Sequence, residues 1–416
     1  MPVEKYGHCK YPIPVRHTRK VPFEPRIRQP DGFGDRALEL RRLDGELDRF
    51  ILKASDYADL LVEAWSENIH RSVSIEGNPL SAQEVRRVVR ESLRPAAGRA
   101  APERADWPRQ EIINHLAVHA NPDEWEVTWT IAGIQGLHKF LLDGAPADTR
   151  PGQWRDFRGV ILSDKGEEVC ITAPPEHIEE EIASLLKWRN ERAEVYFPVV
   201  AATVFFHEFE SIHPFADGNG RTGRVLFHHY LQTQGLPNAH LCMIEPELME
   251  NLERYYHLLA WTDYRGEYTE LVDFFTDSVL RSYQSAVRRL GRKDLLSKGL
   301  DETAKRLLTR AKQDKERWFT VGEAERWVDG RGHATVRRHL NALVEEGALE
   351  SEGRTQGKRY RFRDPLRRVQ ALEAAASPSA LQAARERMRA SRLEIQSEMR
   401  VRPAGQGRPA GPATPA

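Results

Sequence analysis

Cysteine is scarce in this chain of 416 residues, which contains only Cys9, Cys170 and Cys242 and no Cys-x-x-Cys pair. A disulfide framework and a cysteine zinc site both need clustered cysteines, so the sequence argues against both. Chains that lack disulfides typically work in a reducing compartment, and we therefore expect a cytoplasmic protein.

Long hydrophobic runs are absent as well. The longest, from Val195 to Phe206, is interrupted by Pro198. It has about a dozen residues, whereas a membrane-spanning helix needs about 20. The beginning of the chain also has no apolar stretch of signal-peptide length. We expect no membrane association, and we expect the run to form a buried helix.

Neither sign of charge is in excess, because 62 acidic residues balance 62 basic ones. A neutral chain has no general attraction to nucleic acid or to an anionic membrane, although a local basic patch can still provide one. The fractions of hydrophobic residues, 40%, and charged residues, 30%, are typical of a globular protein. The length suggests about two or three domains, and we find no internal repeats.

The spacing of apolar residues predicts a mostly helical chain. After a proline-rich arm, apolar residues follow the period of about 3.6 through most of residues 35–290. One helix is predicted to stop at Gly77-Asn78-Pro79, and Ser81-Ala82-Gln83-Glu84 is a capping box that opens the next. A β-hairpin interrupts the helices, with strands at residues 160–162 and 169–172.

One segment concentrates residues with useful chemistry, and it reads His213-Pro214-Phe215-Ala216-Asp217-Gly218-Asn219-Gly220-Arg221-Thr222-Gly223-Arg224. The histidine precedes a proline, so we place it on a loop at a helix exit, where it offers a base that titrates near neutral pH. The Gly-Asn-Gly turn opens the next helix and presents free N–H groups to an anion. Two arginines on one helix face and a carboxylate complete a site for a polyphosphate and its Mg²⁺. This segment therefore predicts nucleotide chemistry on a hydroxyl group.

Three other motifs are ruled out. A Walker A loop and a Rossmann fingerprint are both absent. His207-Glu208-Phe209-Glu210-Ser211 is close to the zinc motif HExxH, but Ser211 stands where the second histidine is needed.

The segment matches every defined position of His-Pro-Phe-x-[Asp/Glu]-Gly-Asn-Gly-Arg-x-x-Arg, and through these residues the chain resembles the Fic family over roughly residues 57–290. The resemblance implies an all-helical core with a β-hairpin flap, and AMPylation, the transfer of AMP from ATP to a Ser, Thr or Tyr hydroxyl of a protein. It implies that His213 deprotonates the target and that Asp217 holds Mg²⁺. The residues that it assigns to nucleotide binding are Gly218, Asn219, Gly220, Arg221, Thr222, Gly223 and Arg224, the two arginines taking the β- and γ-phosphates.

A second segment, Ser72-Val73-Ser74-Ile75-Glu76-Gly77-Asn78, is similar to the inhibitory motif of the same family, [Ser/Thr]-x-x-x-Glu-[Gly/Asn]. The resemblance implies that Ser72 and Glu76 are inhibitory, with Glu76 pairing with Arg224 and denying it to the γ-phosphate. A carboxylate is a competing anion for the same guanidinium fork. The alternative is an ordinary solvated glutamate at a helix end.

The resemblance also assigns the flap and the adenine pocket. The flap would bind the target by strand addition, and Tyr255 and Tyr256 would lie near the adenine. The alternatives are a plain surface hairpin and tyrosines that pack in the core. Asp263 stands where relatives often carry asparagine, and an ionised aspartate cannot donate a hydrogen bond, which leaves the choice of nucleotide donor open. The flap residues are Val169, Cys170, Ile171 and Thr172.

Residues 301–364 differ in character. Three short helices followed by two strands around a polar tip predict a winged-helix domain. Residues 301–370 carry 17 basic against 12 acidic side chains, a net charge of +5, and basic groups suit phosphate contacts. The alternative is a protein-docking or dimerising module. The recognition-helix candidates are Thr335, Arg337, Arg338, His339 and Asn341, and the wing candidates are Arg354, Lys358, Arg359 and Arg361.

We therefore expect an all-α fold, a Fic-type helical core with a flap, joined to a C-terminal winged-helix (α+β) domain. The expected function is that of an autoinhibited protein adenylyltransferase, which uses ATP and Mg²⁺ on a protein substrate, itself included. Alternatives are a DNA-binding regulator whose core senses a nucleotide, a different donor, and removal of AMP. A homodimer is a further expectation. The expected parts are an N-terminal arm with the inhibitory helix (1–108), the catalytic core (109–290), the winged helix (291–365) and a helical, then disordered tail (366–416).

Overall fold

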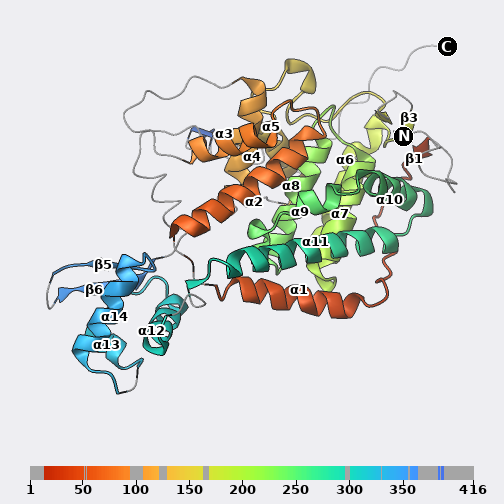
Figure 1. Ribbon diagram of the computed structural model, residues 1–416. Coiled ribbons are helices and arrows are strands. Elements are labelled where there is room, and N and C mark those ends of the chain that lie inside the picture. The colour runs from red at the N-terminus through yellow and green to blue at the C-terminus, as the bar shows by residue number, and fades with distance from the viewer. Residues whose placement is uncertain are drawn as a thin grey trace, which may run out of the picture.

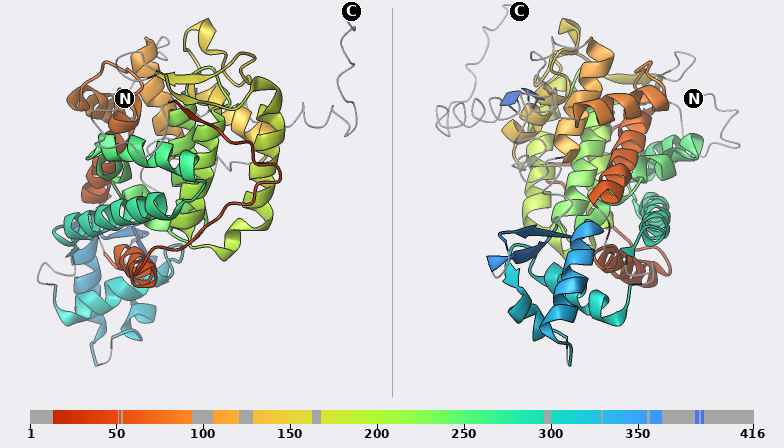
Figure 2. Two further views of the ribbon diagram at one scale, coloured as in Figure 1. Left: turned by 90° about the vertical axis from the view of Figure 1, so that its right-hand side faces the viewer. Right: turned by 60° about the vertical axis from the view of Figure 1, so that its left-hand side comes forward.

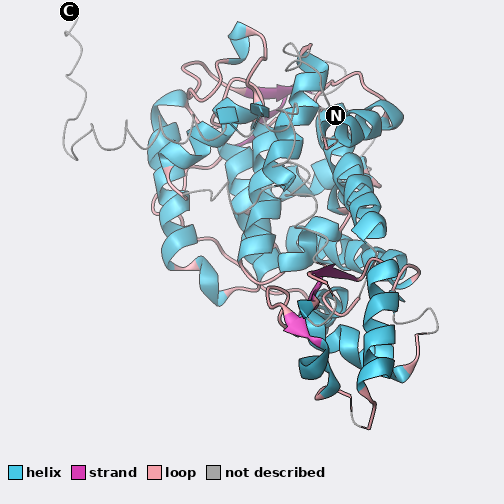
Figure 3. Cartoon of the chain, turned by 90° about the vertical axis from the view of Figure 1, so that its left-hand side faces the viewer, coloured by secondary structure: helices cyan, strands magenta, loops and turns pink. Residues whose placement is uncertain are grey.

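The computed structural model describes residues 14–50, 52, 54–93, 106–120, 129–162, 168–295, 300–328, 330–354, 357–363, 383–384 and 386–387. Helices dominate the described part, as predicted, and two small three-stranded sheets lie at opposite ends of the molecule (Figures 1 and 3). The strands are β1 Val15–Arg16, β2 Val160–Leu162, β3 Glu168–Ile171, β4 Phe319–Thr320, β5 Leu349–Glu352 and β6 Arg359–Phe362.

The α-helices form a large body and a small group beside it (Figure 1). The helices of the large body are α1 Phe33–Leu47, α2 Ala54–Ser74, α3 Ala82–Ser92, α4 Trp107–Ala120, α5 Ile131–Leu141, α6 Ile178–Glu191, α7 Pro198–Ile212, α8 Asn219–Thr233, α9 Ile244–Met249, α10 Leu252–Arg265 and α11 Thr269–Gly291. The small group contains α12 Glu302–Gln313, α13 Val321–Glu325 and α14 His333–Glu345. Short 3-10 helices lie at Ala147–Thr149, Pro175–His177, Ala193–Val195 and Pro237–Leu241.

One apolar core, from Phe23 to Leu290, holds the large body together. The N-terminal helices α1 to α3 share it with the helices that carry the motif. At its centre is α7, which is buried on all sides because its sequence is apolar all round. This helix is the buried helix that the run of residues 195–206 predicted. Among the described residues, no helix is long and apolar enough to cross a membrane.

The segment that resembles the inhibitory motif, residues 72–78, lies where α2 ends. The helix stops at Ser74, three residues before the predicted glycine, and Glu76 lies in the turn that follows. Gly77 has a φ of 94°, a left-handed conformation that glycine adopts without strain. The predicted capping box is confirmed: Ser81 Oγ accepts the N–H of Glu84, and the Glu84 carboxylate accepts the N–H of Ser81.

The predicted hairpin is confirmed as β2 and β3, which pair antiparallel, while its tip at residues 163–167 lies outside the described residues. The sequence did not reveal the third strand of this sheet. The N-terminal arm runs along the outside of the large body (Figure 2), and its strand β1 pairs in parallel with β3. The main-chain N–H of His17 donates to Ile171 O at 2.8 Å. A strand of two residues has no alternating pattern to find, so this pairing is purely tertiary.

The small group has a core of its own, from Leu295 to Phe362. Its element order is helix, strand, helix, helix, strand, strand, with β6 between β4 and β5. The three helices and the terminal hairpin are the elements expected for residues 301–364, and the short strand β4 is added to them. The name winged helix remains a prediction. Of the predicted tail, only residues 383–384 and 386–387 are described.

Candidate active site

The motif forms the connection between α7 and α8 at the centre of the large body. His213 ends α7 in the left-handed conformation, with φ 52°, which is uncommon for a residue other than glycine. Its N–H still donates to Phe209 O at 2.9 Å. Gly218 precedes α8 with φ 78°, and a Cβ there would lie 2.7 Å from Leu142 Cδ1. The loop therefore needs glycine at this position for two independent reasons.

Two side chains brace the loop from within. Asn219 Oδ1 accepts the N–H of Phe215, and Asn219 Nδ2 donates to the carbonyl of Phe215, both at 2.9 Å. His138, from α5, stacks on the Phe215 ring with centroids 3.6 Å apart. Because the N–H of Gly152 donates to His138 Nδ1, the other nitrogen carries the proton and donates to Asp217 O at 2.8 Å. Burial lowers the pKa of His138 to about 4, so the ring is neutral at neutral pH. The sequence analysis missed His138, which has no motif of its own.

Arg155 ties the motif to the flap. Its Nε donates to the carbonyl of His213 at 2.7 Å, and its Nη2 donates to Ile212 O and to Thr172 Oγ1. Burial lowers the pKa of this guanidinium to about 10, so it stays charged at neutral pH. No sequence signal pointed to Arg155, because its partners are distant in the chain. It holds the end of β3 at a fixed place beside the motif.

The hydrogen bonding of His213 defines which ring nitrogen carries the hydrogen. Its Nδ1 lies 3.2 Å from the carbonyl of Glu210, and this carbonyl can only accept, so Nδ1 carries the hydrogen. The lone pair is then on Nε2, and the side chain keeps 26% of its surface exposed. Burial lowers the pKa of His213 to about 4. The ring is therefore neutral at neutral pH and able to accept a proton.

Arg221 is buried between two carboxylates. Its Nη1 contacts Glu111 Oε1 at 2.5 Å and its Nη2 contacts Asp217 Oδ1 at 2.6 Å. Burial alone raises the pKa of Asp217, but the charge of Arg221 outweighs it, and the pKa lies below its ordinary value. Asp217 is thus an ionised carboxylate with 45% of its side chain exposed, which suits a hard cation such as Mg²⁺. In this arrangement Arg221 orients Asp217.

Arg224 is held by Ser72 and Glu76, in the segment that resembles the inhibitory motif. Its Nη2 donates to Glu76 Oε1 and to the carbonyl of Ser72, and its Nε donates to Ser72 Oγ, each at 2.8 Å. Its side chain is only 6% exposed. Gly220 makes room for this contact, since a Cβ there would lie 2.3 Å from Glu76 Oε1. The structure thus brings together the three residues that the resemblance linked.

A second contact joins the turn after α2 to the motif, and no signal in the sequence indicated it. Asn78, just after Glu76, donates through Nδ2 to Glu111 Oε2 at 2.7 Å. Glu111, on α4, contacts Arg221 with its other oxygen. The turn after α2 therefore reaches both arginines of the motif, one directly and one through Glu111.

The rings of the two tyrosines meet edge to face, with centroids 5.3 Å apart, but their exposure differs. Tyr255 is buried at 2% exposure and packs against Phe206 and Phe275, whereas Tyr256 is 36% exposed. The placement of Tyr255 fits the core-packing alternative. Asp263 is also internal, because it accepts a hydrogen bond of 2.5 Å from Ser211, two residues before the motif. The adenine pocket remains a prediction, and Tyr255 also lies beside Arg224 of the motif.

One cluster has the geometry of metal ligands outside the motif. His17, Glu181 and Glu208 each place one ligand atom within 4.8 Å of the others. Lys20 Nζ, however, lies 2.6 Å from Glu208 Oε2, and His17 Nε2 lies 2.7 Å from Glu181 Oε2. These contacts join the carboxylates to the arm, and the cluster anchors the arm to α6 and α7.

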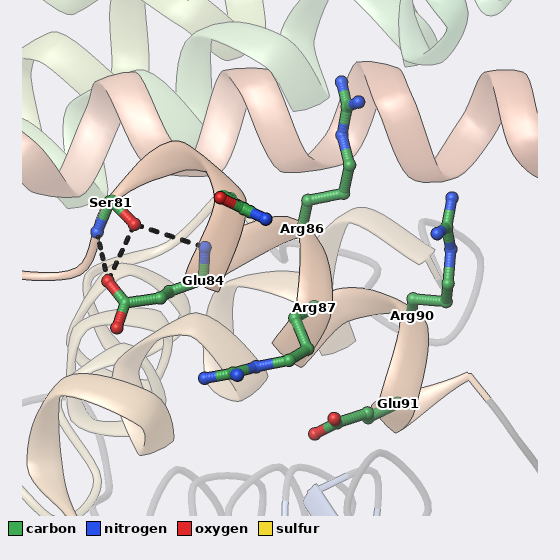
Figure 4. Close-up of a pocket in the computed structure, with 7 residues that line it drawn as sticks. Ser81, Glu84, Arg86, Arg87, Arg90 and Glu91 are labelled. Atoms are coloured by element: carbon green, nitrogen blue, oxygen red, sulfur yellow. Dashed lines mark hydrogen bonds between the residues drawn. The ribbon is translucent and has the colours of Figure 1, made fainter.

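A surface hollow of about 970 Å³ lies on α3, away from the motif (Figure 4). Three arginines project into it, together with both members of the capping box. Two acidic side chains offset part of that positive charge. The residues that line the hollow are Ser81, Gln83, Glu84, Arg86, Arg87, Arg90 and Glu91.

Comparison with known proteins agrees with the motif. Residues 128–231 match the model of the Fic/DOC family. A Drosophila yakuba protein named protein adenylyltransferase Fic is 27% identical over 220 residues, which cover 52% of this chain and 40% of that protein. A Nematostella vectensis protein of the same name is 26% identical over 180 residues, covering 42% of this chain and 39% of that protein. The chain thus spans about two fifths of the length of these relatives.

A solved structure shares the fold. A Fic family protein from Desulfovibrio desulfuricans G20 superposes with a TM-score of 0.51 at 23% identity, over 80% of this chain and 98% of that one. The matched region contains α5 to α7, the flap and most of α8. With the intact motif at the junction of α7 and α8, these findings identify residues 128–231 as a Fic/DOC domain.

Proposed function

We propose that this chain is an autoinhibited protein adenylyltransferase, which transfers AMP from ATP to a Ser, Thr or Tyr hydroxyl of a protein. The observation that carries the proposal is the state of Arg224. This motif arginine is buried and held by Ser72 and Glu76, while the rest of the motif is intact. The curated relatives described above bear the name protein adenylyltransferase.

The proposed reaction begins with His213. The target hydroxyl gives its proton to Nε2, while Nδ1 keeps its own hydrogen. The hydroxyl oxygen then attacks the α-phosphorus of ATP, a P–O bond forms, and pyrophosphate leaves with the electron pair of the broken P–O bond. Positioning contributes most to such a transfer, because the reacting groups need little covalent help. The braced loop around Phe215 supplies that rigidity.

The phosphates would bind at the start of α8. The first N–H groups of this helix, from Asn219 to Arg221, have no acceptor within the helix, and they lie at the positive end of its dipole. Asp217 would hold Mg²⁺, which neutralises phosphate charge when it is bound. The fit is good because Asp217 is ionised and half exposed.

Inhibition would follow from competition for Arg224. With Glu76 in place, the guanidinium cannot serve the γ-phosphate, so ATP binds weakly or with its α-phosphate out of line. Release of the turn after α2 would free Arg224 and, through Asn78 and Glu111, alter the setting of Arg221. We place the switch between the inactive and active forms in this turn.

The flap would bind the protein target by strand addition, and the N-terminal arm limits which strand edges the target can reach. The β1 strand already pairs with β3, which leaves the outer edge of β2 free among the described strands. A target segment would therefore add to β2, or displace β1 from β3. Cys170 and Ile171 of the central strand β3 are paired on both sides in this form, whereas Val169 lies at the irregularity of the β2–β3 register.

The proposal is tested by labelling with α-³²P ATP and Mg²⁺. Wild type, Glu76→Gly and the double variant Glu76→Gly/His213→Ala are incubated with a lysate and also alone, the latter to detect self-modification. Label on protein that is strong only in Glu76→Gly supports transfer, inhibition and the role of the base together. Label that persists undiminished in the double variant excludes His213 as the base. Label in none of them, with ATP still bound, shifts the proposal to another donor or to removal of AMP.

A second candidate function is DNA binding through the small group. Arg337 and Arg338 are exposed on α14 and face solvent, which favours it. Two of the wing candidates are instead engaged, since Arg359 pairs with Glu352 and Arg361 with Glu350, each at 2.5 Å. Binding to duplex DNA that weakens with salt, and that is lost in Arg337→Ala/Arg338→Ala, would support this function. Binding that is unchanged both in this double variant and at high salt would contradict it.

A further inference from the structure

Glu210 has a carboxyl group for which the proposed reaction has no use. It lies on α7, one turn before His213, and its Oε2 is 3.9 Å from His213 Nδ1. Its Oε1 is buried and has no hydrogen-bond partner among the described residues. A buried carboxyl group without a partner is costly, and such groups are uncommon away from functional sites.

The carboxyl group of Glu210 packs against the N-terminal part of α8. A Cβ at Gly223 would lie 2.5 Å from Glu210 Oε1, so this second glycine of the helix makes room for it. Gly220 does the same for Glu76 one turn earlier. The carboxyl groups of Glu76 and Glu210 therefore approach the same face of α8. Glu76 contacts Arg224 there, and Glu210 lies beside His213.

The surroundings of Glu210 bring the pKa of its carboxyl group close to neutral pH. Burial raises its pKa to about 8, Arg224 on α8 lowers it, and Glu76 after α2 raises it again. Tyr255 on α10 also faces it. Around the imidazole of His213 itself, the remaining charged groups are Arg155 and Asp217. Removal of the Glu76 charge is thus expected to lower the pKa of Glu210 and to ionise it more fully at neutral pH.

We propose that Glu210 is a positioning residue for the base: its ionised carboxylate accepts the Nδ1 hydrogen of His213 while Nε2 takes the proton of the target hydroxyl. No bond to Glu210 is made or broken. The negative charge offsets the positive charge of the imidazolium, and Nδ1 moves its hydrogen bond from the main-chain carbonyl of Glu210 to the side chain of the same residue. The proposal rests on the proposed function, in which His213 is the base.

The chemical reason is that an isolated His213 is a weak base. Its pKa of about 4 in the present form makes proton uptake at neutral pH unfavourable. An opposite charge within about 4–6 Å raises the pKa of a histidine by about 1–3 units. The rate of transfer should therefore rise as pH increases through the ionisation of Glu210. In Glu76→Gly this rise should lie at lower pH than in the wild type.

The first test compares Glu76→Gly, Glu76→Gly/Glu210→Gln and Glu76→Gly/Glu210→Asp by rates of AMP transfer from pH of about 6 to 9. The Gln variant keeps the shape and loses the charge, so kcat should fall about tenfold, KM for ATP should stay unchanged, and the rise with pH should vanish. The Asp variant should keep the rise. Glu191→Gln, an exposed change at the end of α6, is the matched control. A Gln variant with the kcat and pH profile of its parent overturns the proposal.

The second test needs no turnover, so it separates this proposal from the proposed function. The ring nitrogens of His213 are followed by ¹⁵N NMR in the wild-type background, with His213→Gln for assignment. They should show a step at the ionisation of Glu210, near pH 8, and Glu210→Gln should lack it. Identical curves overturn the role of Glu210 even where AMP is transferred. A step that is present in a chain without transfer supports the Glu210–His213 pair and contradicts only the proposed reaction.

Discussion

Removing Glu76 should tighten the binding of ATP by an amount that the structure bounds. Glu76 accepts one of the three hydrogen bonds of Arg224, and its side chain is 23% exposed. A hydrogen bond to a charged group contributes about 1.5–3 kcal/mol, and partial exposure favours the lower value. About 1.5 kcal/mol corresponds to roughly a tenfold change in affinity. We therefore expect Glu76→Ala to lower the Kd of Mg·ATP about tenfold.

Calorimetric titration with two nucleotides isolates the cause. ADP has no γ-phosphate to take the place of the Glu76 carboxylate, so its Kd should change much less than that of ATP. In Arg224→Ala the effect of Glu76→Ala should disappear, as expected for two residues that act on one site. Glu67→Ala, also on α2 and paired with Arg86 at the surface, is the control. An equal gain for ADP, or a gain that persists in Arg224→Ala, would refute the competition.

Three further predictions concern the frame of the site. His138→Ala should destabilise the fold by about 2–4 kcal/mol, because it removes a buried ring and two hydrogen bonds; an unchanged urea midpoint would contradict this. Arg155→Ala should lower both the melting temperature and AMP transfer, since one guanidinium holds the motif and the flap; loss of neither would show that the link is dispensable. Acid should weaken the fold, because His119 and His138 have pKa values lowered to about 4 by burial. Below a pH of about 6.5, the unfolded chain binds more protons at these two histidines than the folded chain does. Each histidine therefore lowers the free energy of unfolding by up to about 3 kcal/mol as the pH falls from about 6.5 to 4. Urea unfolding curves that coincide at pH 7.5 and 5 would contradict the burial of neutral histidines.

The fold was predictable where its signals are local. A capping box, an apolar run and a hairpin each depend on neighbouring residues, and α3, α7 and the β2–β3 pair were found from them. The motif is equally local, because its histidine, glycines and arginines need only a loop and the first turn of a helix. Helix α2 ends at Ser74, two residues before its predicted end at Glu76, since the turn after Ser74 is closed by its own hydrogen bonds.

The sequence by itself therefore determined the kind of chemistry, through the order of residues 213–224, and most of the helices. Only the tertiary structure decided which charges meet. Glu111 contacts Arg221, and Glu210 lies beside His213, where Gly223 leaves room for its carboxyl group. The tertiary structure also decided that strand β1 of the N-terminal arm pairs with strand β3 of the flap. The physical reason is that a contact between distant segments depends on how several helices pack, and no short stretch of sequence records that packing.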